Sequence, residues 1–574
     1  MSALKFSRIS ALFCLFSVPF YSFSAAQPDT ANKSDIFSLS QCQWLAEQPK
    51  DRKNNFNIES IDNSNLPDAP NAIISDIRLI RHNIFDTDNP KEDNFLFRGL
   101  NTLNIVTKEH VILQQLLFQQ GDKYDQQLLR ESERILRDAR YLYDAKIEAE
   151  LDCDDNIVVT ITTKELWTLT PEISYSRSGG EDKTQLGFRD TNLLGLGKRV
   201  SLSWRSDADR TGYTFIYEDP NIWGSRYRSR FEFSDNDDGE RIYLDFKLPF
   251  YSLASQQSYG AVTLDDTKEL PLYYRGDVVS EFKQENQINQ VFYGQGDKFG
   301  NWTNRWLIGW QQEDFKFEQI AETTLPLAED RSLNYPWVGY QLIEDKYITL
   351  SNFDSIGRTE DLNLGWNVFA RLGYSDESLA DDDSRVVLEA SAAKALHLND
   401  SMLWRLYTGV HGYWNTEQQK SENLHAYLDT NFLYNSSSYR AWFANLSLRY
   451  GGNLTADQQL TLGGDTGLRG YPLHYQLGDR SVLLNLEKRY YWEYHLLQLF
   501  KVGGAVFFDV GRAWFPDKNN GENGQFLKDA GIGLRLAPSR ATAKTVIHID
   551  LAFPLDKDDE IDTVQWVIKV KNRF

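Results

Sequence analysis

The chain has 574 residues, more than one ordinary soluble domain contains. Aromatic residues make up 13% of it, yet its mean hydropathy is only −0.50. This combination is typical of a transmembrane β-barrel, in which only every second residue faces lipid, although a large secreted β-protein has a similar composition. The formal net charge of −21 argues against binding of nucleic acid, because phosphate contacts need clusters of Lys and Arg.

Residues 1–26 have the pattern of a secretory signal peptide. Lys5 and Arg8 precede the apolar stretch ALFCLFSVPFYSF, and the small residues SAAQ follow, which places cleavage after Ala26. A short membrane anchor is the alternative, but the apolar stretch is shorter than the ~20 residues that a spanning helix needs. Removal of the peptide takes away two positive charges and no negative one, and so changes the net charge from −21 to −23.

Residues 27–72 are polar, with little periodicity, and predict a mostly irregular periplasmic arm. The mature chain keeps two cysteines, Cys42 and Cys153. In an oxidising periplasm they are a candidate disulfide that ties the arm to the first domain. Two free, buried thiols are the alternative. No zinc-binding or redox spacing of cysteines is present, and we expect no metal site.

Residues 73–165 predict a small α+β domain. Alternating residues in 74–85 indicate a strand, and the stretch 86–101 reads as a loop. Thr107 is a plausible N-cap for a helix over 107–118, and 126–143 is a strongly amphipathic helix. Two strands follow, joined by the acidic turn DCDDN. The predicted order is β-α-α-β-β, a three-stranded sheet covered by two helices.

This domain resembles a POTRA (polypeptide-transport-associated) domain. The resemblance rests on the order of the elements, on Gly121, Asp122 and Tyr124 between the helices, and on Val159, Ile161 and Glu165 in the last strand. A generic ferredoxin-like domain is the alternative.

Residues 166–574 read as strand, turn, strand to the end, and predict an antiparallel transmembrane β-barrel. In TVIHIDLAF, Ile547, Ile549, Leu551 and Phe553 share one face, while His548 and Asp550 share the other. Apolar-out, polar-in alternation suits a barrel with a wet lumen, although a soluble sandwich also alternates. The last residue, Phe574, keeps the apolar parity, as in the terminal signal of Gram-negative outer-membrane proteins. Roughly twenty extended segments are visible.

A glycine-rich stretch, GGDTGLRGYP (463–472), lies between two of these strands and contains a single arginine, Arg469. By parity, Glu487 and Asp509 face the lumen from the next two strands. We predict that the loop folds back into the barrel, where Arg469 binds Asp509 with Glu487 nearby, because a guanidinium matches the geometry of a carboxylate. Gly467 and Gly470 would allow the sharp turns. A solvated turn arginine is the alternative.

The segments LRGY, NLEKR, FFDVG, GIGLR and IDLAFPL are similar to the barrel of the BamA/TamA/FhaC superfamily of outer-membrane insertases and two-partner secretion transporters. The resemblance implies that the motif Arg469, Gly470, Tyr471 enters the lumen and locks onto Asp509. It also implies sixteen strands, which we adopt in place of the count of twenty. Those relatives carry several POTRA domains, or two, whereas this chain has room for one and an arm.

The predicted function is therefore outer-membrane protein assembly or translocation: the POTRA-like domain receives an unfolded client, which the barrel inserts or secretes. The expected partners are unfolded outer-membrane or secreted proteins, outer-membrane lipid and lipopolysaccharide. A passive channel or structural surface protein is the alternative. An enzyme is less favoured, since no GxSxG or HExxH motif is present, and no cofactor is expected because no P-loop is found. The acidic runs at 235–240 and 379–385 read as divalent-cation sites or, alternatively, as solvated turns.

Overall fold

The computed structural model describes residues 66–571 except 321–325, 357, 381, 438, 465, 517–523, 542–545 and 557–560. All described residues belong to one compact unit. The predicted signal peptide, most of the predicted arm, Cys42 and Phe574 lie outside the described residues. Within them, no helix combines the length and the apolar character needed to cross a membrane.

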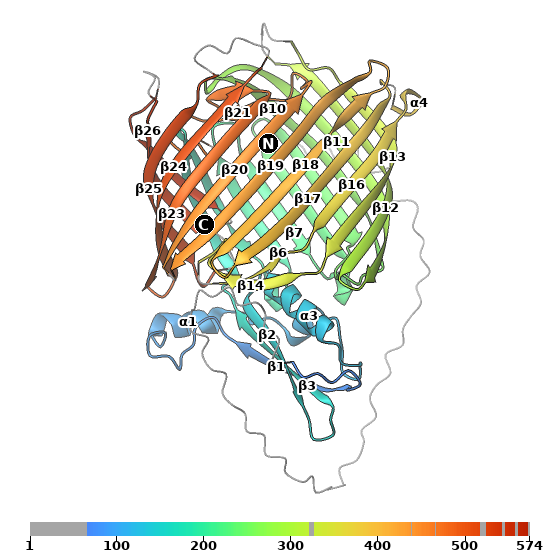
Figure 1. Cartoon of the computed structure of the whole chain (residues 1–574), viewed down its shortest axis with the longest axis vertical. Helices are drawn as coiled ribbons and strands as arrows, with labels where there is room; N and C mark the ends of the chain where they lie inside the picture. The colour runs from blue at the N-terminus through green and yellow to red at the C-terminus, as the bar shows by residue number, and fades with distance from the viewer. Residues whose placement is uncertain are drawn as a thin grey trace, which may run out of the picture. The chain divides into compact units, whose positions relative to one another are not determined.

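The N-terminal domain contains β1 (Ile74–His82), α1 (Phe95–Leu103), α2 (Glu109–Leu113), α3 (Gln126–Asp138), β2 (Leu142–Leu151) and β3 (Ile157–Glu165) (Figure 1). The strands are ordered β1-β3-β2, with β1 parallel and β2 antiparallel to β3. The sheet is thus mixed, and the element order includes three helices where the sequence predicted two.

Two local expectations for this domain were wrong. The stretch 86–101, predicted as a loop, contains most of α1, which begins where the Asn94 side chain accepts a hydrogen bond from the Phe97 amide. Thr107 does not cap α2, since the N-cap is Lys108 and has no side-chain capping bond. The Thr107 hydroxyl instead donates to Glu165 on β3, at 2.9 Å. A side chain that donates to a buried acceptor elsewhere in the fold is not available to cap the helix.

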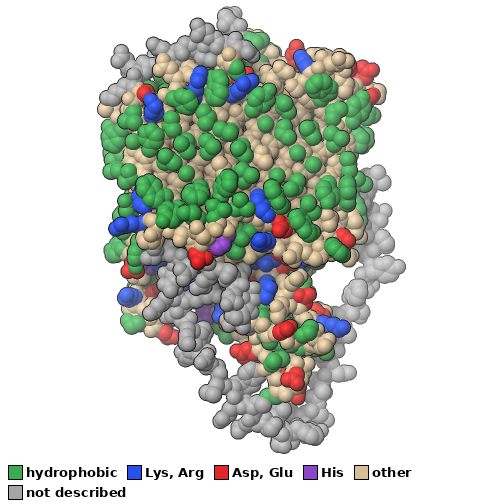
Figure 2. Space-filling view, in the orientation of Figure 1, with side chains coloured by type: hydrophobic (Ala, Val, Ile, Leu, Met, Phe, Trp, Pro, Cys, Tyr) green, Lys and Arg blue, Asp and Glu red, His purple; other side chains and the backbone are tan. Residues whose placement is uncertain are grey.

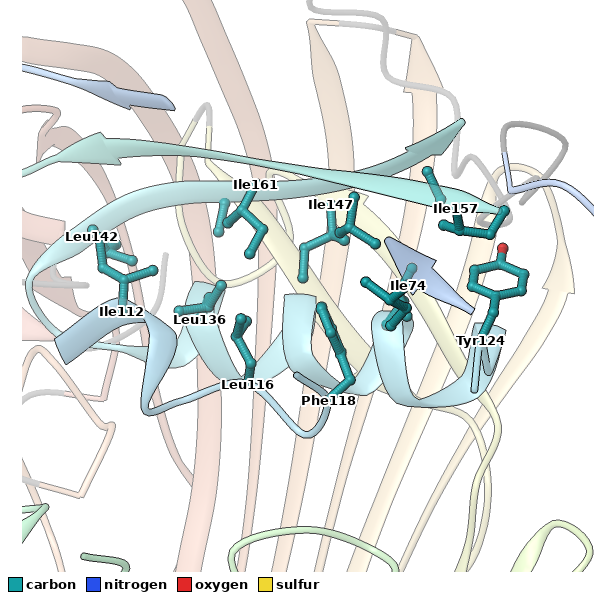
Figure 3. Packing of buried hydrophobic residues seen from close by; sticks show 14 of the residues in the cluster. Ile74, Ile112, Leu116, Phe118, Tyr124, Leu136, Leu142, Ile147, Ile157 and Ile161 are labelled. Atoms are coloured by element: carbon teal, nitrogen blue, oxygen red, sulfur yellow. The ribbon is translucent and has the colours of Figure 1, made fainter. Parts of the chain in front are cut away.

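The core of the domain lies between one face of the sheet and the helices. Leu129 and Leu136 of α3 pack with Ile147 of β2 and Ile161 of β3, and all four are buried (Figure 3). These positions follow the periods of 3.6 and 2 that helix and strand require, which is why the amphipathic pattern was readable from the sequence.

Residues from Leu169 onward form a closed antiparallel barrel of 20 strands (Figure 1). They are β4 (Leu169–Ser178), β5 (Glu181–Asp190), β6 (Arg199–Ser206), β7 (Thr211–Asp219), β8 (Arg228–Asn236), β9 (Gly239–Leu248), β10 (Gln257–Tyr274), β11 (Asp277–Phe299), β12 (Trp302–Gln319), β13 (Arg331–Glu344), β16 (Asn367–Ser375), β17 (Arg385–Asn399), β18 (Met402–Asn415), β19 (Lys420–Ser437), β20 (Arg440–Gly452), β23 (Arg480–Leu496), β24 (Phe500–Trp514), β25 (Leu527–Pro538), β26 (Val546–Pro554) and β27 (Gln565–Lys571).

The prediction of sixteen strands was therefore wrong. That number came from the family resemblance, whose motifs lie mainly in β23–β27 and leave the number of preceding strands open. The alternation of the chain itself, which had suggested roughly twenty segments, was the better guide. Each wall strand must bury one face and form backbone hydrogen bonds with a neighbouring strand. Each strand therefore has its own period-2 pattern in the sequence.

The outer surface of the barrel carries a broad apolar band, with charged side chains gathered near its two rims (Figure 2). On β26, Phe553 is 41% exposed, while His548 and Asp550 are buried on the inner side. Trp566 and Val570 of β27 are exposed on the outer face. This is the surface that a barrel surrounded by lipid requires.

A hairpin lies between β13 and β16 and consists of β14 (Tyr347–Ser351) and β15 (Thr359–Asn363). It packs on inward-facing apolar residues of the wall, among them Leu403 and Leu433. Arg405 of β18 holds its tip, because the guanidinium makes two hydrogen bonds with Asp354 and lies 4.1 Å from the Phe353 ring. The hairpin therefore occupies the barrel interior near the mouth that contacts the N-terminal domain.

The seam where the first and last wall strands meet is weakly paired. Among the described residues, β27 and β4 are in register at a single pair, Ile568 opposite Arg177. The neighbouring β26–β27 ladder, in contrast, runs from Val546 opposite Lys571 to Ala552 opposite Gln565. The barrel closes, but this joint has few of the ladder hydrogen bonds that hold the others.

Candidate functional site

The lumen loop, defined as residues 453–479, joins β20 to β23 and contains the short strands β21 (Leu460–Leu462) and β22 (Gln476–Gly478). Leu468 and Tyr471 are fully buried and pack with Leu483 of β23 and Leu527 of β25. Arg469 is 4% exposed. The loop thus lies inside the barrel against its wall, and not outside in solvent.

Arg469 binds three carboxylates. Its Nε donates to Asp509 Oδ2 at 2.7 Å and its Nη2 to Asp509 Oδ1 at 2.8 Å, a bidentate pair. Its Nη1 donates to Glu487 Oε1 at 2.9 Å and lies 3.4 Å from Asp550 Oδ2. The guanidinium carbon is 3.5 Å from the centre of the Phe507 ring. Bidentate hydrogen bonds and a stacked ring fix both the position and the plane of the guanidinium.

The backbone on either side of Arg469 is shaped by two glycines. Gly467 has φ of +128°, which L side chains rarely adopt, and its carbonyl accepts from Asn485 Nδ2 at 2.9 Å. The Gly470 amide donates to Asp529 Oδ2 at 3.0 Å, and a Cβ on Gly470 would lie 2.7 Å from the Cβ of Asp529. The loop approaches the wall so closely that Gly470 has no room for a side chain.

Tyr471, the third residue of the motif, anchors the loop to β25. Its hydroxyl donates to the Lys528 carbonyl at 2.8 Å and accepts from the Lys528 amide at 3.1 Å. The three motif residues therefore contact different groups of the wall. Arg469 binds the carboxylates, Gly470 donates to the Asp529 side chain, and Tyr471 bonds to the backbone of β25.

The clamp, meaning Arg469 with its carboxylate partners, is part of a larger buried network. Glu487 also accepts from Arg489 Nε at 2.9 Å, and Asp550 is bound by Arg535. Arg489 and Arg535 are among the largest fully buried side chains of the described chain. The network therefore balances carboxylates against guanidinium groups on four consecutive strands, β23–β26, as buried charges require.

Sequence reasoning found Glu487 and Asp509 and missed Asp529, Asp550, Arg535 and Phe507. The signal for Asp550 was present, because parity placed it on the polar face of its strand. Arg535 lies in the GIGLR segment, and Phe507 shares the inward parity of Asp509. What the sequence lacked was the register between strands, which decides which inward residues stand beside the loop.

The N-terminal domain is fixed to the barrel mouth by buried polar contacts. The Thr107 hydroxyl accepts from Asn192 Nδ2 at 2.9 Å, and Asn192 lies in the turn that contains the 3₁₀ turn η1 (Leu193–Gly195). Arg137 of α3 makes two hydrogen bonds with Asp361 of β15, at 2.6 and 2.8 Å. The mouth hairpin is thus bound to the domain by Arg137 and to the wall by Arg405.

Glu165 ends β3 and lies at this contact. Burial raises its pKa to about 7, and hydrogen bonds from the Thr107 hydroxyl and amide only partly oppose that rise. This side chain, part of the predicted POTRA motif, is therefore a group at the contact whose charge changes near neutral pH.

The two cysteines predicted to pair are only partly described. Cys153 is disulfide-bonded. Cys42 lies outside the described residues, so the pairing of the two remains a prediction.

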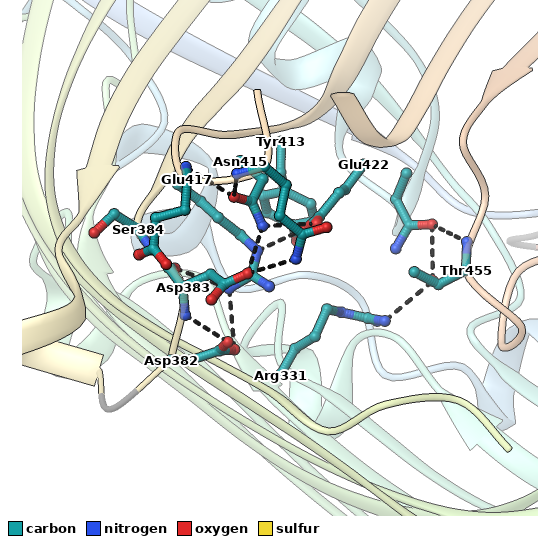
Figure 4. Close-up of polar contacts among 12 residues, drawn as sticks. Arg331, Asp382, Asp383, Ser384, Tyr413, Asn415, Glu417, Glu422 and Thr455 are labelled. Atoms are coloured by element: carbon teal, nitrogen blue, oxygen red, sulfur yellow. Dashed lines mark hydrogen bonds and ion pairs between the residues drawn. The ribbon is translucent and has the colours of Figure 1, made fainter. Parts of the chain in front are cut away.

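The acidic run 379–385 is engaged by protein donors (Figure 4). Asp382 pairs with Arg385 at 3.0 Å, and Asp383 accepts from Asn415 Nδ2 at 2.8 Å. In the other run, Asp238 pairs with Arg210. Across the described residues, no group of three or more His, Cys, Asp or Glu is arranged to hold a metal ion.

Comparisons with known proteins agree with this geometry. Residues 192–572 match the family model described as the Omp85 superfamily domain, and residues 94–165 match the POTRA model described as surface antigen variable number repeat. No curated protein matches the chain.

Three solved structures are similar at low identity. BamA from Haemophilus ducreyi lacking POTRA domains 1–3 is 12% identical, with 87% of this chain and 84% of that chain covered and a TM-score of 0.39. CdiB from Acinetobacter baumannii is 10% identical, with coverages of 93% and 94% and a TM-score of 0.38. CdiB from Escherichia coli is 13% identical, with coverages of 87% and 76% and a TM-score of 0.43.

The family matches carry the assignment, because the superfamily model spans most of the chain and includes the lumen loop, all the clamp carboxylates and the last strand, β27. The chain belongs to the Omp85 superfamily, as an outer-membrane β-barrel with a periplasmic POTRA domain.

Proposed function

We propose that this protein receives unfolded outer-membrane or secreted proteins at its POTRA domain and inserts or secretes them through its barrel. Membership of the Omp85 superfamily supports an outer-membrane protein assembly or secretion role. The observation that carries the finer proposal is the clamped lumen loop beside a mouth that the POTRA domain contacts directly.

The POTRA sheet offers an edge for a client. β1 is an edge strand, and the segment near Gly121 pairs with its start, where the Gly121 amide donates to the Ile74 carbonyl at 2.9 Å. Further along β1, the side chain of Arg78 is 54% exposed. An extended client segment adding to this edge would gain main-chain hydrogen bonds without a demand on its sequence, as strand addition does elsewhere. The other edge strand, β2, contacts α3 and the mouth hairpin.

Depletion of the protein in its own bacterium tests the proposal. We expect particular outer-membrane or secreted proteins to accumulate unassembled in the periplasm, as identified by quantitative proteomics of the fractions. A photo-crosslinker at Arg78 is expected to trap the same proteins, whereas one at Glu150 of β2 serves as the matched control on the opposite edge. Depletion that changes no outer-membrane or secreted protein would contradict the proposal.

A passive channel remains the second candidate. The lumen loop and the mouth hairpin both occupy the interior, which disfavours a large steady conductance. Single-channel recording in a planar bilayer separates the two functions: an assembly factor is expected to show small, irregular currents, and a porin a large constant one.

A further inference from the structure

The seam between β27 and β4 contains a cavity of about 1230 Å³. Pockets for small ligands usually measure ~300–1,000 Å³, so this one has room for a larger molecule. It runs from Trp167, beside the start of β4, to the turn at Asp209, beyond the other end of the wall. The cavity therefore follows the joint along the height of β4 and β5.

Both faces of the wall contribute to its lining. Glu172 and Arg189 point into the lumen, while Ile547 and Val570 share the parity of the exposed residues that face lipid. A cavity lined from the two sides of one wall opens through that wall. It joins the polar interior to the surrounding hydrocarbon at the place where strand pairing is weakest.

The lining is amphipathic along its length. Near the periplasmic rim it contains Leu100 of α1, Leu499, Phe500 and Ile547, all apolar. Beside them, on the lumen side, Arg189 pairs with Glu172, and its Nε is buried without a hydrogen-bond acceptor among the described residues. An apolar surface open to lipid next to an arginine with a spare donor matches one class of molecule, an amphiphile whose headgroup contains a phosphate.

Backbone chemistry points the same way. Inside a bilayer every backbone N–H and C=O must find a partner, and an unsatisfied group costs several kcal/mol. Among the described residues, β27 and β4 are in register at one pair only, so the ladder between them satisfies few of their backbone groups. A bound headgroup and its water supply such partners, whereas acyl chains alone do not.

We propose that this cavity is a binding site for one phospholipid of the inner leaflet. The phosphate is held by Arg189, and the acyl chains lie against the apolar residues at the periplasmic rim. The lipid fills the joint that the strands leave open. This inference is independent of the client-handling function proposed above.

The test uses the full-length protein, delipidated in detergent, and native mass spectrometry with added dioleoylphosphatidylethanolamine. Wild type is expected to bind one lipid that survives mild activation. Val570→Trp fills the apolar end, and Arg189→Gln removes the charge. Each variant is expected to weaken lipid binding about tenfold. Loss of a hydrogen bond to a charged group has an effect of about that size, and we expect a similar effect from the steric block by Trp.

Matched controls separate a built site from lipid that merely coats the barrel. Val506→Trp changes another exposed valine on the outer face. Arg449→Gln changes another arginine, which is paired with Asp429. Both are expected to bind lipid as wild type does. Folding of every variant is checked by the gel shift of unheated barrels, so that loss of binding is compared among folded proteins alone.

Three results would overturn the proposal. One is the absence of any retained lipid in the wild type. Another is equal loss in Val506→Trp and Val570→Trp, which would mean unspecific coating. The third is binding of inorganic phosphate as tight as that of the phospholipid, which would make the site one for free anions.

Discussion

The clamp wall, β23–β26, and the seam, β27 and β4, are neighbours in the barrel but are stabilised by different means. The clamp wall has long ladders and a buried network in which Arg469 binds three carboxylates. The seam has one register pair among the described residues and an amphipathic cavity. The wall is therefore held more firmly at the clamp, where the lumen loop is bound, than at the seam.

The difference shows where the barrel can change shape at low cost. Opening at the clamp would break ion pairs that have no access to water, whereas opening at the seam breaks few backbone bonds. Each of the following variants or conditions perturbs one region of the molecule at a time.

Arg469→Ala is expected to have the largest effect. It leaves Asp509 buried without its cation and removes one of the arginines that bind Glu487, at a cost of about 3–5 kcal/mol. We expect a membrane-inserted barrel with a protease-sensitive lumen loop, a lower urea midpoint and poor client assembly. Arg449→Ala, which removes an arginine whose pair with Asp429 is partly exposed, is the control. Equal assembly by Arg469→Ala and wild type would remove the functional role of the clamp.

Arg137→Ala tests whether the mouth hairpin belongs to the rigid side. It removes two charge-assisted hydrogen bonds to Asp361 and is expected to cost about 1.5–3 kcal/mol. Hydrogen exchange should accelerate in β14 and β15 and stay unchanged in β23–β26. Arg140→Ala, which breaks a more exposed pair with Glu218, should have a smaller effect. Unchanged exchange in the hairpin would show that its remaining contacts, through Arg405, Arg358 and Thr359, are sufficient to hold it.

Gly470→Ala perturbs the clamp without removing a charge. The added Cβ would lie 2.7 Å from the Cβ of Asp529, and such overpacking costs about 1–3 kcal/mol. The loop should shift and the thermal midpoint fall. Gly99→Ala in α1, where a Cβ meets nothing within 4 Å, is expected to be neutral or slightly stabilising. A midpoint equal to that of wild type would mean that the wall yields at Asp529.

The smallest effect is expected from pH at the POTRA contact. The folded-state pKa of Glu165, about 7, lies above its ordinary value near 4.5. Its contribution to stability is therefore complete below about pH 4.5 and is lost as pH rises to about 7. Hydrogen exchange in α2 should be faster at pH 8 than at pH 5.5 after correction for intrinsic rates. Glu165→Gln should flatten that dependence, and a persistent slope would assign it to another group.

Much of the clamp was readable from the sequence, because period-2 alternation is strict in a wall that separates lipid from a wet interior. That rule placed Glu487 and Asp509 inward, and the glycines around Arg469 indicated a loop able to reach them. The functional role assigned to these residues stays a prediction. The alternation does not determine the register between neighbouring strands, and so Asp529 and Asp550 were not predicted to contact the loop.

The failures have equally local causes. The strand β14 alternates as a wall strand does, with Ile348 and Leu350 on one face, and no signal in residues 347–363 says that the hairpin folds inward. Thr107 was taken for a cap because its partner Glu165 is 58 residues away in the chain. The prediction of sixteen strands replaced the count made from the sequence itself by a number taken from the family resemblance, whose motifs lie mainly near the end of the chain.

The position of the clamp along the chain has a consequence for biogenesis. Arg469 precedes all of its carboxylate partners, the last of which, Asp550, stands in the penultimate strand. A nascent barrel that lacks β24 therefore keeps a cation in its interior without its bidentate partner Asp509, and premature sealing is penalised. The last contact, with Asp550, forms only when the polypeptide is threaded nearly to its end, so that the ion network acts as a built-in check on completeness.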